Sequence, residues 1–123
     1  MTDAVSLHVL CRQEGIRPKG VVPVEGEQHV YDSVSWRVRQ DQVAGLIGKT
    51  FCLHEGKTQP SYMGGEILAI ERQQIEDNDG EVRAVVRFRA TREARGIKWP
   101  PTNNPNEYCH VNSEIPIDQL RKR

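Results

Sequence analysis

This chain lacks long hydrophobic runs, and it lacks an excess of charge of either sign. None of its apolar runs approaches the roughly 20 residues of a membrane-spanning helix, so no membrane partner is expected. Lysine plus arginine and aspartate plus glutamate both number 17, which gives a formal net charge of zero. A protein that coats nucleic acid without specificity gains its affinity mainly by neutralising phosphates. The charge balance argues against that class but leaves room for a local basic face.

Cysteine is scarce, and its pattern is not that of a disulfide framework. The chain has three cysteines, an odd number, and no two of them stand in CxxC spacing. This fits a reducing cytosol better than an oxidising compartment. The first residues, Met-Thr-Asp-Ala-Val, carry neither the basic region nor the sustained apolar core of a secretory signal. We therefore expect a cytoplasmic protein.

The length and composition suit one small globular unit. The chain has 123 residues, of which 37% are hydrophobic. That is enough for one compact core, so we expect a single domain over residues 1–123. The number of subunits cannot be derived from the sequence.

The segment from residue 49 to residue 70 organises the chain. Phe51 and Leu53 alternate with Cys52 and His54, which predicts a strand over 51–54 with two different faces. Turn-forming residues follow, and a second strand is predicted over 66–71. The Gly64-Gly65 pair before it indicates a bulge or a backbone that another group approaches closely.

The strongest strand pattern covers residues 81–91, after an Asp-Gly turn. Apolar side chains occupy one face and arginines the other.

A short helix is predicted over 40–47, where Asp41 can cap the start and Gly48 the end. Further short strands are expected at 6–11, 21–24, 30–38 and 108–111, with a strand or helical turn at 115–120. Short strands, tight turns and one or two short helices predict a mainly β (α+β) chain, a small curved or partly open β-barrel.

The order of these elements resembles the PUA-like superfamily, especially its EVE and ASCH branches. A short helix leads through Gly48 into a strand with an apolar-x-His end, and the segment Gly-Gly-Glu-Ile-Leu-Ala-Ile-Glu follows a loop. The element Arg95-Gly96-Ile97-Lys98-Trp99 also resembles family material. The resemblance covers roughly residues 36–111. It rests on the order of the elements and on the types of residue within them. It implies a nucleic-acid-binding domain, RNA or DNA, that reads a modified or extruded base.

Aromatic residues are few, and several of them fall in predicted loops or loop edges. A flipped base is held by stacking on rings while polar groups read its edge. We expect Tyr62 and Trp99 to stack on the base, with His54 or Ser61 on its edge. Trp99 is expected to lid a cleft. The candidate base-binding residues are Tyr62, Trp99, His54, Ser61 and Tyr108, while Trp36 is expected in the core.

Arginines are dense between residues 83 and 98. Alternate residues of a strand point the same way, so a phosphate backbone can lie along this row. The other reading is a solvated outer face paired with carboxylates. The candidate phosphate-binding residues are Arg83, Arg87, Arg89, Arg95 and Lys98, to which Arg37 and Arg39 can add.

No cofactor is expected, and a metal site is the weaker alternative. Cys52 and His54 share a strand face, and Cys109 with His110 can approach from a neighbouring strand. Thiolates and imidazoles bind zinc, but the spacing is not that of a zinc finger or ribbon. His8 and His29 have no partner pattern.

Catalysis is also an alternative to the binding role, and the motif content argues against it. The chain has no P-loop, no GxGxxG and no Ser-His-Asp order. The resemblance to ASCH proteins, some of which hydrolyse an acyl group from a modified nucleoside, implies Lys57, Thr58 and Glu66 as the catalytic candidates. A threonine nucleophile needs a base within hydrogen-bond reach, and a loop leaves that geometry open. A protein-interaction or inhibitor module without a ligand pocket is the remaining alternative.

Overall fold

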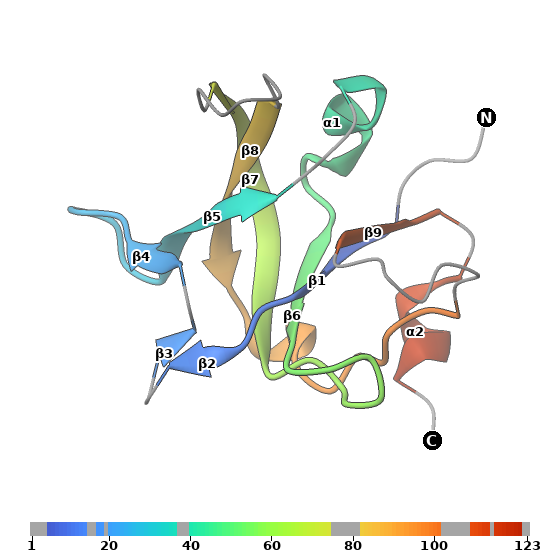
Figure 1. Cartoon of the computed structure of the whole chain (residues 1–123). Helices are drawn as coiled ribbons and strands as arrows, with labels where there is room; N and C mark the ends of the chain where they lie inside the picture. The colour runs from blue at the N-terminus through green and yellow to red at the C-terminus, as the bar shows by residue number, and fades with distance from the viewer. Residues whose placement is uncertain are drawn as a thin grey trace.

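A computed structural model describes residues 5–14, 17–18, 20–36, 40–74, 82–101, 109–113 and 115–121. Most of the strands form one seven-stranded mixed sheet (Figure 1). Its strands are β1 (Ser6–Leu10), β4 (Val21–Pro23), β5 (Val30–Trp36), β6 (Thr50–His54), β7 (Met63–Gln74), β8 (Val82–Ala90) and β9 (Cys109–Asn112). A separate two-stranded ribbon comprises β2 (Gln13–Glu14) and β3 (Arg17–Pro18).

The sheet has the strand order β4-β5-β8-β7-β6-β1-β9. β1 runs parallel to β6, and the other neighbours in this order are antiparallel. Within the described part of the chain β4 and β9 are the two edges and do not pair, so the sheet is not closed into a barrel. The predicted β-rich fold is therefore confirmed. The strands predicted at 51–54, 66–71 and 81–91 are antiparallel neighbours in this sheet.

The helices are short. They are α1 (Gln40–Leu46), the 3-10 helix η1 (Arg92–Ala94) and α2 (Ile117–Leu120). Helix α1 ends one residue before the end of the predicted range, where Gly48 adopts a φ of 83° and the Lys49 amide donates to the Leu46 carbonyl. No helix in the described ranges is long and apolar enough to span a membrane.

The two adjacent glycines of β7 allow its backbone to pack closely against both neighbours. A Cβ on Gly64 would lie 1.9 Å from the Phe51 carbonyl oxygen, and one on Gly65 would lie 1.7 Å from that of Arg89. The predicted close approach is therefore real, and the approaching group is the protein's own backbone. The irregularity in the β7–β8 pairing lies further along, between Ile67 and Ala69.

Alternate residues of each strand point to opposite faces of the sheet. Around β1 and β6, other parts of the chain cover both of these faces. The main core occupies one of them and includes Leu7 and Val9 of β1 with Phe51 and Leu53 of β6. Phe88 of β8 packs against Phe51 with ring centroids 5.1 Å apart. The face of β8 predicted to be apolar contributes to this core.

The second face of the same strands is covered by the C-terminal part of the chain. Cys52 packs there in a small cluster with Ile97 and with Leu120 of α2. Figure 1 shows α2 and the orange segment before it on the side of β6 and β9, away from β4 and β5. The Lys98 amide donates to the Leu120 carbonyl and joins these two covering segments. Polar side chains of β1, β6 and β9 are therefore enclosed beneath an apolar cover.

Candidate functional site

A polar layer of histidine, cysteine and serine lies on the second face of β1 and β6. The two strands are parallel, and their register pairs Ser6 with Thr50 and His8 with Cys52. Residues paired in register project from the same face, and His54 lies two positions after Cys52 on that face. His8, Cys52 and His54 therefore converge, although His8 is far from the others in sequence.

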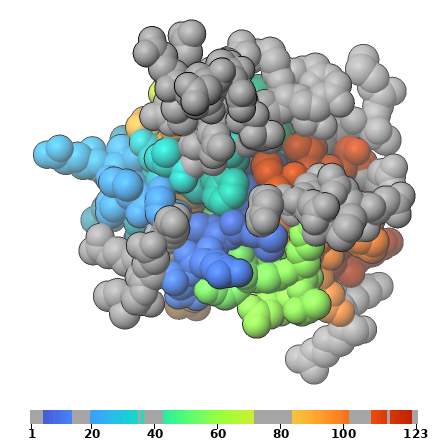
Figure 2. All heavy atoms as spheres, viewed as in Figure 1, coloured from blue at the N-terminus to red at the C-terminus, as the bar shows by residue number. Residues whose placement is uncertain are grey.

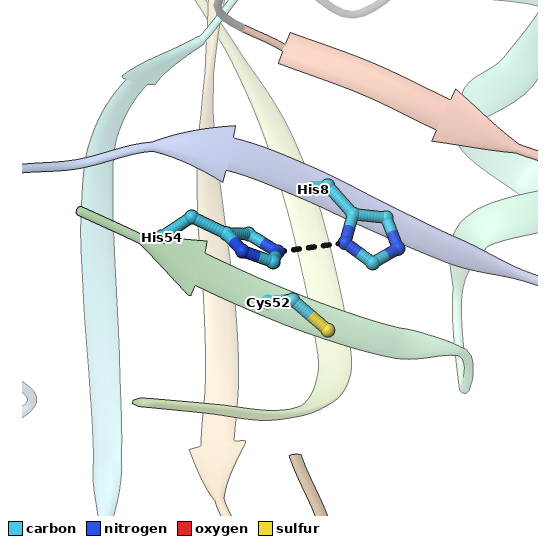
Figure 3. Close-up of side chains that lie close together, drawn as sticks. All are labelled: His8, Cys52 and His54. Atoms are coloured by element: carbon cyan, nitrogen blue, oxygen red, sulfur yellow. Dashed lines mark hydrogen bonds between the residues drawn. The ribbon is translucent and has the colours of Figure 1, made fainter. Parts of the chain in front are cut away.

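The three side chains meet through the atoms that can bind metals. His8 Nδ1 and His54 Nε2 are 2.9 Å apart (Figure 3). One ring nitrogen of each histidine and the Cys52 Sγ all lie within 4.8 Å of one another. All three residues have no exposed surface, so the cluster is closed to bulk water.

A chain of hydrogen bonds assigns the tautomers of both imidazoles. A carbonyl oxygen only accepts, so the His54 Nδ1 proton is donated to the Gln59 carbonyl at 3.0 Å. His54 Nε2 is then the acceptor for the proton on His8 Nδ1. His8 Nε2 in turn accepts from the Ser6 hydroxyl at 2.7 Å, and the Asn112 amide donates to that hydroxyl oxygen at 3.1 Å. Every ring nitrogen of this pair has a partner while both rings are neutral.

Burial keeps the cluster uncharged. It lowers the pKa of His8 to about 2, with His54 and His110 adding to the effect. Burial also lowers the pKa of His54 and raises that of the Cys52 thiol to about 12, where Arg121 and Ser61 oppose the shift. Without a bound cation, the group consists of two neutral imidazoles and a thiol.

Trp99 forms the wall of this layer. Only 8% of the residue is exposed, and its ring meets His54 edge-on with centroids 5.1 Å apart and His8 at 5.9 Å. The Lys57 ammonium lies 5.6 Å from the ring centroid. The indole Nε1 is buried and has no hydrogen-bond partner among the described residues. Trp99 was expected to lid a cleft, but it is enclosed because the 97–101 segment folds onto the histidines.

Tyr62 lies elsewhere. Its ring is half-buried against the main core, and its hydroxyl donates to the Cys11 carbonyl. Figure 2 shows blue residues from the start of the chain lying directly against green residues from its middle. Tyr62 packs with the main core and Trp99 with the histidines on the other face, so the two rings do not face each other across one cleft.

Ser61 and His54, the candidates for reading a base edge, are used internally. Ser61 is 4% exposed, and its hydroxyl donates to the Ala94 carbonyl at 2.5 Å and accepts from the Ile97 amide at 3.0 Å. These bonds fasten the segment after η1 to the start of β7. His54 is fully buried in the histidine layer, and Tyr108 lies outside the described residues.

The structure assembles half of the predicted metal-ligand set. Cys52 and His54 lie together, whereas Cys109 pairs in register with Val9 and packs against the main core on the opposite face. His110 pairs with His8 across β1 and β9 on the histidine face. His8 itself was missed, although its alternation with Leu7 and Val9 placed it on the polar face of a strand.

The three catalytic candidates are not assembled. Glu66 pairs in register with Thr50 at the start of β6, is exposed, and lies 3.6 Å from Arg89. Lys57 and Thr58 follow the other end of β6, beyond His54. A five-residue strand is roughly 13 Å long, which keeps the carboxylate away from the loop threonine.

The arginine row on β8 is largely paired with carboxylates. Arg87 contacts both carboxylate oxygens of Asp32 on β5, at 2.8 and 3.0 Å. These bonds and the negative charge of Asp32 raise the pKa of Arg87. Arg89 is paired with Glu66, and the side chain of Arg83 lies outside the described residues, as do Arg37 and Arg39. Lys98 is exposed beside the Trp99 cover.

A second candidate site is a basic pocket at the end of the sheet where β8 passes into η1. The pocket has a volume of about 240 Å³. It is lined by His29, Met63, Gly64, Ala90, Thr91, Arg92 and Arg95. The backbone holds it together, since the Thr91 amide donates to the Gly64 carbonyl and the Ala90 amide to that of His29. Of the predicted phosphate-binding residues, Arg95 lines this pocket.

The described residues thus offer two candidate sites, an enclosed histidine–cysteine cluster and an open basic pocket. They lie at different places in the fold, the cluster beneath Trp99 and the pocket beside η1. Comparison with protein-family models, with curated proteins and with solved structures finds no match for this chain.

Proposed function

We propose that the protein binds single-stranded nucleic acid, with Arg92 and Arg95 holding a phosphate at the basic pocket. The observation that carries this proposal is which arginines are paired with a carboxylate and which are not. Both Arg92 and Arg95 are exposed, and neither has a carboxylate partner within the described part of the chain. An unpaired guanidinium offers its planar donors to a phosphate at no cost in broken ion pairs.

The paired arginines of β8 are less suited to this role. Arg87 would have to release a two-bond contact with Asp32 before it could bind a phosphate. Arg89 would compete with Glu66 in the same way. The phosphate contact is therefore assigned to the arginines that follow β8, and not to the strand itself.

The shape of the pocket restricts what can enter. Its volume of about 240 Å³ lies below the roughly 300–1,000 Å³ of clefts that enclose drug-sized ligands. It suits one base or one phosphate group of a longer strand. Met63 and Ala90 supply an apolar wall, and Thr91 supplies a hydroxyl.

The resemblance to EVE domains extends the proposal to a modified or extruded base. Such a base would lie on Met63 and Ala90, since the rings of Tyr62 and Trp99 are engaged on different faces of the sheet. A single strand already exposes its bases, so the cost of flipping is absent. RNA and DNA share the phosphate chemistry, and the experiment below includes both.

The test is fluorescence anisotropy with labelled single-stranded RNA and DNA of mixed sequence. Arg92→Gln and Arg95→Gln should each weaken binding several-fold, and the affinity of the native protein should fall as salt rises. Each phosphate contact contributes a slope of about −0.7 in log affinity against log salt for a single strand. Each variant should flatten the slope by about that amount.

Arg87→Gln is the matched control, because it removes one positive charge from the preceding strand β8 without touching the pocket. It should change binding much less than Arg92→Gln. Equal losses from the three variants would show that only net charge matters. Binding that none of the variants weakens would overturn the assignment of the pocket.

A further inference from the structure

We infer that His8, Cys52 and His54 bind one zinc ion, with a water molecule as the fourth ligand. This inference is independent of the proposed nucleic-acid function, because no residue of the cluster lines the basic pocket. It rests on three features of the cluster: the convergence of three ligand atoms, the partners of the outer ring nitrogens and the orphaned indole of Trp99.

The first feature is the spacing of the ligand atoms. In a tetrahedral zinc site, bond lengths of about 2.0–2.1 Å to nitrogen and 2.3 Å to sulfur place ligand atoms about 3.3–3.6 Å apart. His8 Nδ1 and His54 Nε2 are 2.9 Å apart, and one ring nitrogen of each histidine lies with the Cys52 Sγ within 4.8 Å. Small rotations of the side chains therefore reach the required geometry. The three atoms project from neighbouring parallel strands toward one point (Figure 3).

The second feature is that the outer nitrogens already have acceptors. Histidine ligands usually donate their other N–H to a carbonyl, carboxylate or water, which fixes the ring orientation. His54 Nδ1 donates to the Gln59 carbonyl at 3.0 Å, and that bond stays unchanged when Nε2 binds the metal. His8 Nε2 lies 2.7 Å from Ser6 Oγ, which can accept a proton as well as donate one.

Loading the ion requires a simple proton balance. The proton of His8 moves from Nδ1 to Nε2, where it is donated to the Ser6 hydroxyl oxygen. The thiol of Cys52 loses its proton to solvent and becomes a thiolate. One proton is released for each zinc ion bound, and the thiolate cancels one of the two positive charges. The enclosed site then carries a single positive charge in place of two.

The third feature is the unpaired indole of Trp99. A buried N–H without an acceptor is rare in a folded protein and calls for an explanation. The Trp99 ring packs edge-on against both histidines, so the indole forms part of the wall of this cluster, and its Nε1 is buried. A water molecule on the fourth corner of the tetrahedron would accept that N–H. It would thereby satisfy the one buried side-chain polar atom that the described residues leave without a partner.

The donor set selects the metal. Two imidazoles and a thiolate suit zinc and related transition metals, whereas magnesium and calcium require oxygen ligands. The three ligands have no exposed surface, so the ion acts on the fold and not on a substrate. It would join β1 to β6 and hold the Trp99 segment against both.

The test uses the full-length protein and the metal alone. Protein produced with added zinc should retain one zinc ion per chain after dialysis, measured by elemental analysis. Replacement by cobalt should give a thiolate-to-cobalt charge-transfer absorption band together with the visible bands of a tetrahedral site. Removal of zinc by a chelator should lower the unfolding temperature, and added zinc should restore it.

Cys52→Ser should abolish the charge-transfer band, and Cys109→Ser is the matched control. Cys109 is also a cysteine on a strand, but it lies against the main core on the opposite face. Its substitution should leave both the band and the zinc content unchanged. Trp99→Phe should keep the band but weaken zinc binding by about tenfold, as loss of an outer hydrogen bond does.

Folded native protein that holds no zinc and gives no cobalt band overturns the inference. This result would show that the hydrogen bonds among Ser6, His8 and His54 are the final state of the cluster. The measurement of zinc content and of the cobalt band uses the native protein alone. A Cys52→Ser protein that fails to fold therefore leaves the test intact. A band that survives in folded Cys52→Ser and disappears in Cys109→Ser would also overturn the assignment.

Discussion

His8 and His54 are 46 positions apart in the sequence, and their imidazoles are joined by a hydrogen bond of 2.9 Å. The parallel pairing of β1 with β6 brings them together, in a sheet whose other neighbouring strands are antiparallel. Strands that run parallel need a long connection, and here the connection includes β4, β5 and α1. The most polar part of the interior therefore lies at the junction of two segments that are distant in the chain.

We expect the Ser61 hydroxyl to stabilise the fold and not to contact a ligand. Ser61→Ala leaves the Ala94 carbonyl and the Ile97 amide without their side-chain partner in a buried position. We expect a loss of about 1–3 kcal/mol in the free energy of unfolding, measured in urea. Thr58→Ala, at an exposed position of the preceding loop, is the control and should stay within about 0.5 kcal/mol. A Ser61→Ala protein as stable as this control would contradict the fastening role.

The close packing of β7 against β8 should make Gly65 intolerant of any side chain. A Cβ at this position would lie 1.7 Å from the Arg89 carbonyl oxygen, and backbone cannot move aside as a flexible side chain can. Gly65→Ala should therefore lower the free energy of unfolding by about 1–3 kcal/mol or prevent folding. At Gly56 a Cβ meets nothing within 4 Å, so Gly56→Ala should be nearly neutral. Similar stabilities of the two variants in thermal unfolding would refute this packing.

Tyr62 should make stability depend on pH in the alkaline range. Burial raises the pKa of its hydroxyl above the ordinary value of 10.0, and the hydrogen bond to Cys11 adds to the shift. The unfolded chain loses this proton near pH 10 while the folded chain keeps it. The stabilisation that the protonated Tyr62 hydroxyl contributes to the folded state is therefore complete below pH 10. It is lost as the pH rises above 10.

The measurement is urea unfolding on either side of pH 10, with tyrosinate absorbance followed in the folded protein. The Tyr62 hydroxyl should resist ionisation until the protein unfolds. Tyr62→Phe should remove that resistant residue and reduce the alkaline loss of stability. If Tyr62→Phe loses stability above pH 10 as steeply as the native protein does, the hydroxyl is not the cause.

Trp99 should behave as a core residue. It is 8% exposed and packs against His8 and His54, so Trp99→Ala should cost about 3–5 kcal/mol of unfolding free energy. Trp99→Phe keeps most of the buried ring and should cost less. Chemical denaturation of both variants decides the point. A Trp99→Ala protein whose free energy of unfolding falls by less than about 1 kcal/mol would contradict the core role. It would indicate that Trp99 covers a cleft at the surface, as the sequence predicted.

The strands and the first helix could be read from the sequence because their signals are local. The alternation around Val86 and Phe88 depends only on neighbouring residues, and the strand appears within one residue of the predicted range at each end. Helix α1 ends just before Gly48, because glycine adopts a positive φ readily, which is a property of the residue itself. The β-rich class followed from these local patterns.

The candidate sites depended on contacts between distant segments, which periodicity does not encode. Cys52 and His54 were recognisable as potential ligands on one strand face, but their third partner, His8, is supplied by the pairing of β1 with β6. In the same way Asp32 reaches Arg87 only because β5 pairs with β8, and this pairing separates the engaged arginines from those of the basic pocket.

Burial of Trp99 was also a tertiary outcome. A tryptophan between Lys98 and Pro100 has the local composition of an exposed loop. It is buried because residues 97–101 and α2 fold onto the second face of the sheet, where the histidines and Cys52 need an apolar cover. The sequence by itself determined which segments form strands and which faces are apolar. The tertiary structure decided which polar faces meet, since pairing between strands is selected by the packing of the whole sheet.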